Sequence, residues 1–99
     1  MNVTVNTRHM EASSSAVKYV EKKAPRLSKY YDNVQSIEVV LDSEAGQPKV
    51  EMVVHAAPKQ IFVAHHREED LFAAIDQCLD KIAQQLRKHK EKLRDPQAV

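Results

Sequence analysis

The sequence predicts a single α+β domain with the element order β-α-β-β-β-α. Three observations support this: a length of 99 residues, two segments with apolar residues at helical spacing, and four short segments of alternating apolar and polar residues. A chain of this length suits one domain with one core. Its hydrophobic fraction of 42% and charged fraction of 29% are ordinary for a folded protein. We expect a four-stranded sheet with both helices packed on one face.

The first strand and the first helix lie close together in the chain. Residues 2–7 alternate, and Ser13 is a suitable N-cap for the segment that follows. Beyond Ser13, apolar residues recur at helical spacing over about 18 residues. Pro25 lies inside this span, where it removes a backbone hydrogen bond and crowds the preceding turn. We expect one kinked helix, because the apolar stripe stays in phase across Pro25 as far as Tyr31; two shorter helices are the alternative.

Three further strands are expected before the second helix. Residues 34–42, 49–56 and 61–66 alternate in the manner of half-buried strands. Between them, residues 43–48 and residues 57–59 have the composition of turns. The first two strands should pair in parallel through a right-handed helical crossover, and the later connections should be hairpins. One-sided alternation predicts that one face of the sheet is solvated.

The second helix is expected over residues 70–94, with Asp70 as its cap. At 1.5 Å per residue it would be about 37 Å long. The residues predicted to form its apolar face are Leu71, Ala74, Ile75, Cys78, Leu79, Ile82, Leu86 and Leu93.

Charge is unevenly distributed although the formal net charge is only +1. Residues 18–29 carry five basic side chains against one acidic, and residues 81–94 carry six against one. The rest of the chain is therefore acidic. A polyanion that meets only the basic part would not experience the neutral sum, because charges are screened over about 8 Å at physiological salt.

The basic residues follow stripes on both predicted helices. On the first, Lys22, Arg26 and Lys29 share the solvent side, with tyrosines at the flank. Such a surface suits RNA, because cations meet phosphates and phenol rings can stack on bases. On the second, Lys81, Lys88 and Lys92 share one solvent-side stripe, and Arg87 lies on the other flank. The alternative is a solvated helix whose last-turn bases complement the helix dipole.

Several other chemistries are disfavoured by the sequence. One glycine excludes the G-x-G-x-x-G phosphate loop, and one cysteine excludes an internal disulfide or a multi-cysteine zinc site. His65 and His66 point to opposite faces of a strand, and His9 and His89 are expected to be exposed. Cys78 is expected to be a small core residue. Without an apolar run of membrane length or a signal peptide, we expect a soluble cytoplasmic protein.

The second-helix segment resembles that of the short ribosome hibernation-promoting factors, which are related to the ribosome-associated inhibitor A and were once called sigma-54 modulation proteins. The matching blocks are Asp70-Leu-Phe-Ala-Ala-Ile-Asp76 and Asp80-Lys-Ile-Ala-Gln-Gln-Leu-Arg-Lys-His-Lys-Glu-Lys-Leu-Arg94. Leu27-Ser-Lys-Tyr-Tyr-Asp32 resembles the end of the family's first helix. The resemblance covers residues 2–94.

This resemblance implies a fold similar to double-stranded-RNA-binding domains, and binding of small-subunit rRNA in the mRNA and tRNA channel. Translation would be blocked in stress or stationary phase by a factor that is a monomer off the ribosome. It implies no catalysis, cofactor or metal, with residues 1–95 as the ribosome-binding domain and residues 96–99 as a flexible tail. The RNA-facing residues would be Lys22, Lys23, Arg26, Lys29, Lys81, Arg87, Lys88, Lys90 and Lys92. A free-standing double-stranded-RNA-binding module and a protein that binds an acidic partner are the alternatives.

Overall fold

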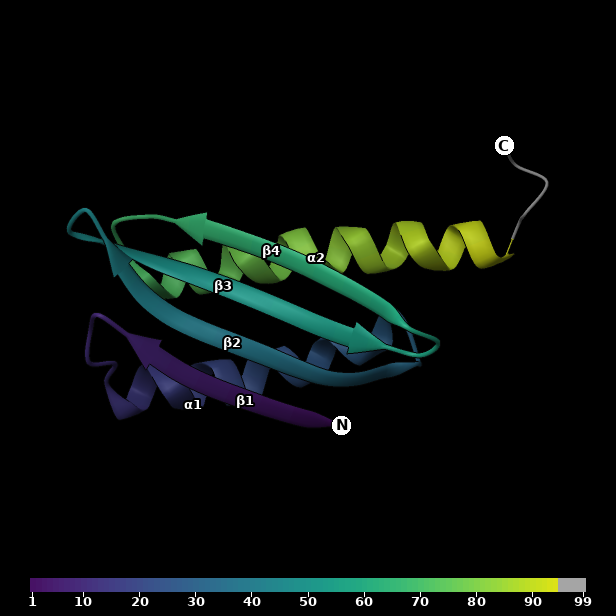
Figure 1. Ribbon diagram of the computed structural model, residues 1–99, viewed down its shortest axis with the longest axis horizontal. Helices are drawn as coiled ribbons and strands as arrows, with labels where there is room; N and C mark the ends of the chain where they lie inside the picture. The colour runs from purple at the N-terminus through teal and green to yellow at the C-terminus, as the bar shows by residue number, and fades with distance from the viewer. Residues whose placement is uncertain (95–99) are drawn as a thin grey trace.

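The computed structural model describes residues 1–94 and has every predicted element in the predicted order (Figure 1). The strands are β1 (Asn2–Arg8), β2 (Val34–Glu44), β3 (Gln47–Ala56) and β4 (Gln60–Arg67). The helices are α1 (Ser14–Lys23), the short 3-10 helix η1 (Ala24–Lys29) and α2 (Leu71–Arg94). The α+β prediction is confirmed. The expected tail of residues 96–99, the domain end at residue 95 and the side chain of Leu93 lie outside the described part.

The four strands form one sheet in the order β1-β2-β3-β4. β1 and β2 are parallel and are joined through α1 and η1, whereas the two later pairs are antiparallel hairpins, as predicted. Val39 of β2 lies between Val5 of β1 and Met52 of β3. Because side chains alternate along a strand, this register directs the apolar set of each strand to the same face.

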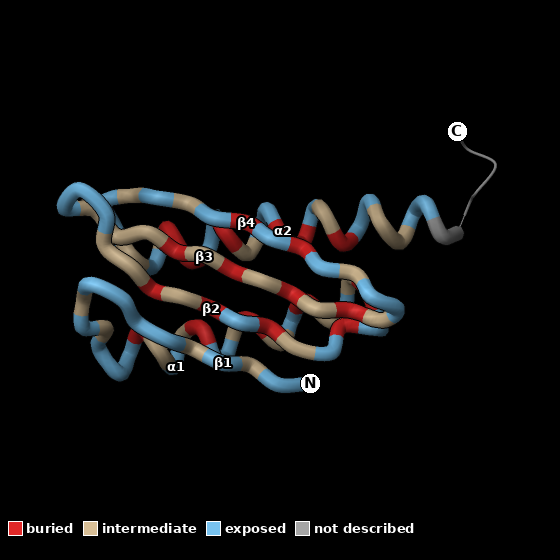
Figure 2. The backbone as a smooth tube through the Cα atoms, in the orientation of Figure 1, coloured by how far each residue is buried: buried red, intermediate tan, exposed pale blue. Residues whose placement is uncertain are grey.

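Both helical segments cover the same face of the sheet, and the other face is open (Figure 1). α2 packs against β3 and β4, while α1 contacts β1 and η1 contacts β2. Buried positions alternate along the strands, as Figure 2 shows, because only the covered face meets the helices. The largest fully buried side chains are Ile37, Leu41, Met52, Ile75, Ile82 and Leu86. On the predicted apolar face of the second helix, Leu71 and Leu79 are partly buried, and five residues are buried: Ala74, Ile75, Cys78, Ile82 and Leu86.

The first helix differs from the prediction of one kinked helix. Ser13 is the N-cap, with its hydroxyl oxygen accepting from the Ala16 N–H at 3.2 Å. The α-helix ends at Lys23, and the chain continues directly as the 3-10 helix η1, with Pro25 in its first turn. Proline has no N–H to donate and crowds the preceding turn, so the α-helical pattern stops there. The apolar stripe nevertheless continues, because Leu27 remains buried.

The turn predicted over residues 43–48 is shorter than expected. Strand pairing extends to Glu44 and Gln47, so that only Ala45 and Gly46 form the turn. Both have positive φ, 52° and 80°. Two central residues with positive φ are typical of the two-residue hairpin turn whose twist matches the flanking strands. Gly46 takes this conformation at no steric cost, whereas Ala45 is held in it by the strand pairing around it.

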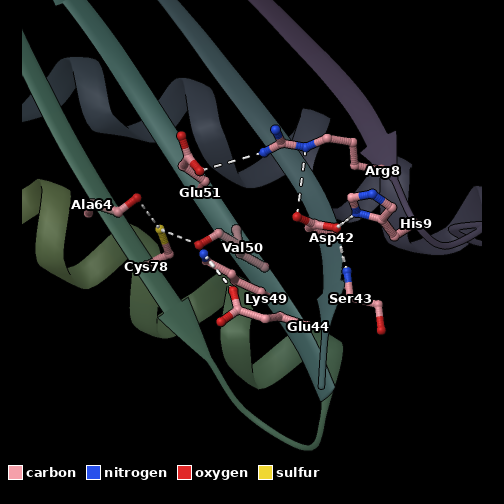
Figure 3. Close-up of polar contacts among 10 residues, drawn as sticks. All are labelled: Arg8, His9, Asp42, Ser43, Glu44, Lys49, Val50, Glu51, Ala64 and Cys78. Atoms are coloured by element: carbon pink, nitrogen blue, oxygen red, sulfur yellow. Dashed lines mark hydrogen bonds and ion pairs between the residues drawn. The ribbon is translucent and has the colours of Figure 1, made fainter. Parts of the chain in front are cut away.

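The open face of the sheet carries a network of ion pairs at one end. Arg8 of β1 reaches both Asp42 of β2 and Glu51 of β3, each at an N–O distance of 3.7 Å (Figure 3). His9 Nδ1 lies 2.9 Å from the Asp42 carboxylate, and this hydrogen bond lowers the pKa of Asp42. The acidic side chains of Asp42 and Glu51 thus lie on the face of the sheet away from the helices. Farther along this face, Ile61 of β4 is 61% exposed.

His89 is not the exposed side chain that the sequence suggested. Its ring lies edge-to-face against Tyr31 and Phe62, with centroid distances of 5.1 and 5.4 Å. Within the described residues, its Nε2 is buried without a hydrogen-bond partner. The aromatic neighbours at the end of the sheet draw this histidine inward, which its position among lysines in the sequence did not indicate.

Among the described residues, no helix has the length and apolar character to cross a membrane.

Cys78 should resist thiol reagents while the protein is folded. The thiol is buried beneath the sheet, 3.4 Å from the carbonyl oxygen of Ala64 and 3.8 Å from that of Val50 (Figure 3). Burial raises its pKa to about 12. At pH 8 only about one thiol in ten thousand would be the reactive thiolate. We expect no labelling by Ellman's reagent in the native protein and one equivalent after denaturation in guanidinium. Native labelling at the rate of a free thiol would contradict this burial.

Candidate nucleic-acid interface

α1 and α2 are joined by a polar and aromatic contact. The Tyr19 hydroxyl on α1 donates a 2.6 Å hydrogen bond to Asp76 on α2. The Tyr19 ring also meets Phe72 of α2 edge-to-face, with centroids 5.2 Å apart. The hydrogen bond to the carboxylate raises the pKa of Tyr19, so the phenol stays protonated at neutral pH. This contact fixes the spacing of α1 and α2 on the covered face of the sheet.

A groove of about 370 Å³ lies between η1 and α2 and is called the interhelical groove below. Three of the predicted RNA-facing residues line it: Lys23, Arg26 and Lys29. The other lining residues are Leu27, Tyr30, Asp76, Leu79, Asp80 and Ala83. Leu27 and Ala83 are buried core residues, so the floor of the groove is apolar while its rim is charged.

Tyr30 is the centre of a second group of cations at the end of the interhelical groove. Lys29 Nζ lies 5.5 Å and Arg87 Cζ lies 5.2 Å from the centroid of its ring. A smaller hollow of about 210 Å³ joins these three residues to Lys90 and Glu91. The structure thus brings Arg87 and Lys90 of α2 beside the bases of η1. Five of the nine predicted residues gather around the two hollows.

Two further predicted residues lie on the opposite flank of α2. Lys81 Nζ donates a 2.9 Å hydrogen bond to the backbone carbonyl of His65 in β4. One turn on, Gln85 donates a 3.0 Å bond to the carbonyl of Val63. These side chains cover carbonyls along the outer edge of β4, where an unpaired strand would otherwise be open to pairing. Lys88 lines the hollow beside them. Lys81 therefore has a structural contact that helical spacing alone did not reveal.

The last two predicted residues, Lys22 and Lys92, are exposed on α1 and α2. Neither lines the hollows described above. The nine bases therefore form a charged layer around the helical side of the molecule and not one continuous stripe. A cationic rim, an apolar floor and a tyrosine ring are features that can bind both the phosphates and the bases of a nucleic acid.

Three features of this site were missed in the sequence. Asp76 and Asp80 line the groove among the cations, although neither was among the predicted RNA-facing residues. Gln85 gave no signal, since a glutamine on a helix flank is ordinary. The contact between Tyr19 and Asp76 could not be predicted from the sequence, because the packing of the two helices against each other brings these residues together.

Fold and site together define a small α+β domain with a basic helical layer on one side of a four-stranded sheet. The chain belongs to the Sigma 54 modulation protein / S30EA ribosomal protein family, whose sequence profile matches residues 3–94. It is 35% identical over 92 residues to the ribosome hibernation promoting factor of Azotobacter vinelandii, covering 93% of this chain and 85% of the relative. The corresponding protein of Escherichia coli K12 is 32% identical, with coverage of 95% and 98%.

Two solved structures share the fold. The N-terminal domain of Protein Y from Thermus thermophilus superposes with a TM-score of 0.79 and 30% sequence identity, covering 90% of this chain and 99% of that domain. A ribosomal subunit interface protein from Coxiella burnetii gives a TM-score of 0.85, with 93% and 100% coverage and 22% identity. The second similarity supports the fold alone.

Proposed function

We propose that this protein is a ribosome hibernation factor that binds rRNA of the small ribosomal subunit through its helical side and blocks translation. The observation that carries the proposal is the gathering of cations from η1 and α2 around the interhelical groove and Tyr30. The names of its relatives support the same activity. Residues 1–95 would be the ribosome-binding unit, acting in the cytoplasm during stress or stationary phase.

The mechanism is occupancy of the channel that mRNA and tRNA normally use. Bases on η1 and α2 would neutralise rRNA phosphates, releasing the counterions that surround them. α2 is about 36 Å long at 1.5 Å per residue, and it is held against the sheet by buried apolar side chains such as Ile75, Ile82 and Leu86. A rigid body of this size would exclude mRNA and tRNA by volume alone. No bond is made or broken in this mechanism, so it requires neither catalytic residues nor a cofactor.

The proposal predicts that purified small subunits outcompete a plain RNA duplex at equal phosphate concentration. A folded channel can contact several faces of the protein, whereas a duplex contacts one. Each neutralised phosphate contributes roughly −0.7 to −0.9 to the slope of log affinity against log salt. If about half of the nine bases engage, the slope should be about −3 to −4. Co-sedimentation at several salt concentrations measures both quantities.

Each other result selects a different function. Equal binding to subunit and duplex would identify a free-standing RNA-binding module. A nearly flat salt dependence would mean that the bases are only solvated, and that a partner is recognised by other means. Preference for an acidic protein over either RNA would identify an interaction protein. Any of these outcomes would overturn the hibernation assignment.

A further inference from the structure

Asp80 is unexpected in a surface that only attracts phosphate. Asp80 lines the interhelical groove together with three cationic residues, and it is exposed. Asp76, the other carboxylate of the groove, accepts the hydrogen bond from Tyr19 and so has a structural role. Within residues 1–92, the Asp80 side chain takes part in no hydrogen bond and no ion pair. The fold therefore leaves both of its oxygens free to accept.

The position of Asp80 along α2 does not explain why an acidic residue is found there. The helix dipole favours acidic residues in the first turn of a helix. α2 begins at Leu71, so Asp80 lies well beyond that turn. Asp76 lies four residues earlier, and two like charges at this spacing weaken a helix. Neither the helix dipole nor its spacing from Asp76 favours Asp80, so its role should be sought in the groove.

The remaining lining of the groove suits one nucleotide. Its volume of about 370 Å³ is within the range of pockets that hold small ligands. Of the apolar lining residues, Leu27 and Ala83 are buried and Leu79 is partly buried, so Leu79 can contact the plane of a base. The ring of Tyr30 at the rim can stack on a base, and the cations beside it can hold the flanking phosphates. A hydrogen-bond acceptor among these groups, such as the Asp80 carboxylate, would select a base that carries hydrogen-bond donors.

We infer that the interhelical groove holds one unstacked guanine of an RNA strand, with the Asp80 carboxylate accepting from its N1–H and its 2-amino group. Guanine presents two adjacent donors on its Watson–Crick edge, which match the two oxygens of one carboxylate. Adenine and cytosine each place an acceptor next to their amino group, and uracil has a single N–H between two carbonyls. The inference rests on the proposed function, because it assigns a sequence preference to the same RNA-binding side.

The test uses a short uridine-rich RNA strand with one central guanine, and the same strand with inosine in its place. Inosine lacks only the 2-amino group. By fluorescence anisotropy, the wild-type protein should bind the guanine strand about tenfold more tightly, as for other bidentate contacts to a base. In the Asp80→Asn variant the two strands should bind equally. Removing a carboxylate from a cationic groove would by itself strengthen the binding of any RNA strand. A loss of affinity that is confined to the guanine strand therefore identifies recognition of the base.

The matched control is Glu69→Gln, which removes one exposed carboxylate outside the groove. It should retain the preference for guanine. Equal affinity of the wild type for both strands, absence of binding to either, or an unchanged preference in Asp80→Asn would overturn the inference. So would an equal gain for both strands in Asp80→Asn, which would show that Asp80 only repels phosphate. Melting temperatures should match that of the wild type, and the inosine comparison stands without any variant.

This result can be separated from the proposed function. If small subunits bind with a steep salt dependence but the strands show no preference, the guanine site fails and the hibernation function stands. If the preference is present but subunits bind no better than a duplex, the guanine site stands and the hibernation function fails.

Discussion

Charge reversal of Arg26, Lys29 and Arg87 to glutamate is expected to weaken binding to the small ribosomal subunit at least about a hundredfold. These residues surround the interhelical groove and the Tyr30 ring from both η1 and α2. At physiological salt, losing one phosphate contact costs roughly four- to fivefold in affinity through counterion release alone. Three lost contacts give about a hundredfold, and the repulsion introduced by three glutamates adds to it.

The fold should survive these substitutions, because all three side chains are exposed. Lys29 and Arg87 would lose their contacts with the Tyr30 ring, each worth about 0.5–1 kcal/mol at an exposed site. The free energy of unfolding should therefore fall by no more than about 2 kcal/mol. Co-sedimentation with small subunits, inhibition of cell-free translation and thermal melting together separate lost binding from lost folding.

The control for this variant reverses charge on the open face of the sheet. Glu38→Lys with Glu51→Lys removes two weak ion pairs, to His55 and Arg8, both at 3.7 Å. Exposed pairs of this kind contribute at most about 1 kcal/mol each. The control raises the net charge, so a purely electrostatic, non-directional attraction would strengthen binding. Unchanged binding in the control, with loss in the groove variant, would place the interface on the helical side. The reverse pattern would place it on the sheet.

The secondary structure could be predicted because each element obeys its own period. Alternation in the strands and helical spacing in α2 depend only on which face is buried. The length of α1 could not be predicted in the same way. Leu27 faces the core whether the chain beyond Pro25 is a kinked α-helix or a 3-10 helix, so the apolar pattern does not distinguish them. Ala45 has no turn preference of its own, and strand pairing imposes its positive φ.

The site was predicted less completely than the fold, for a geometric reason. Helical spacing gives the angle of a side chain around α2 but does not show what lies beside each flank. One flank faces η1, where Arg87 joins the bases of the groove. The other faces the edge of β4, where Lys81 bonds to the carbonyl of His65. All three residues of the stripe Lys81, Lys88 and Lys92 are exposed, but Lys81 is also hydrogen-bonded to the sheet, which is why the groove variant avoids Lys81.

The largest effect on stability is expected from Leu86→Ala. Leu86 is fully buried in the layer between α2 and the sheet. Replacing a buried leucine by alanine typically costs about 2–5 kcal/mol, through lost transfer free energy and the cavity left behind. For a domain of this size, each kcal/mol lowers the melting temperature by about 4–8 °C. We therefore expect a decrease of at least about 10 °C in a thermal melt.

Alanine has the highest helix propensity, so this loss cannot be assigned to a weaker helix. The matched control is Gln84→Ala, at an exposed position two residues earlier, where the unfolding free energy should change by less than about 0.5 kcal/mol. At low temperature, where Leu86→Ala remains folded, it should bind small subunits like the wild type, because the buried Leu86 side chain lines neither the interhelical groove nor the hollow beside Tyr30. A melting temperature close to that of the wild type would contradict the burial of Leu86. Lost binding by folded Leu86→Ala would mean that the groove depends on core packing for its shape.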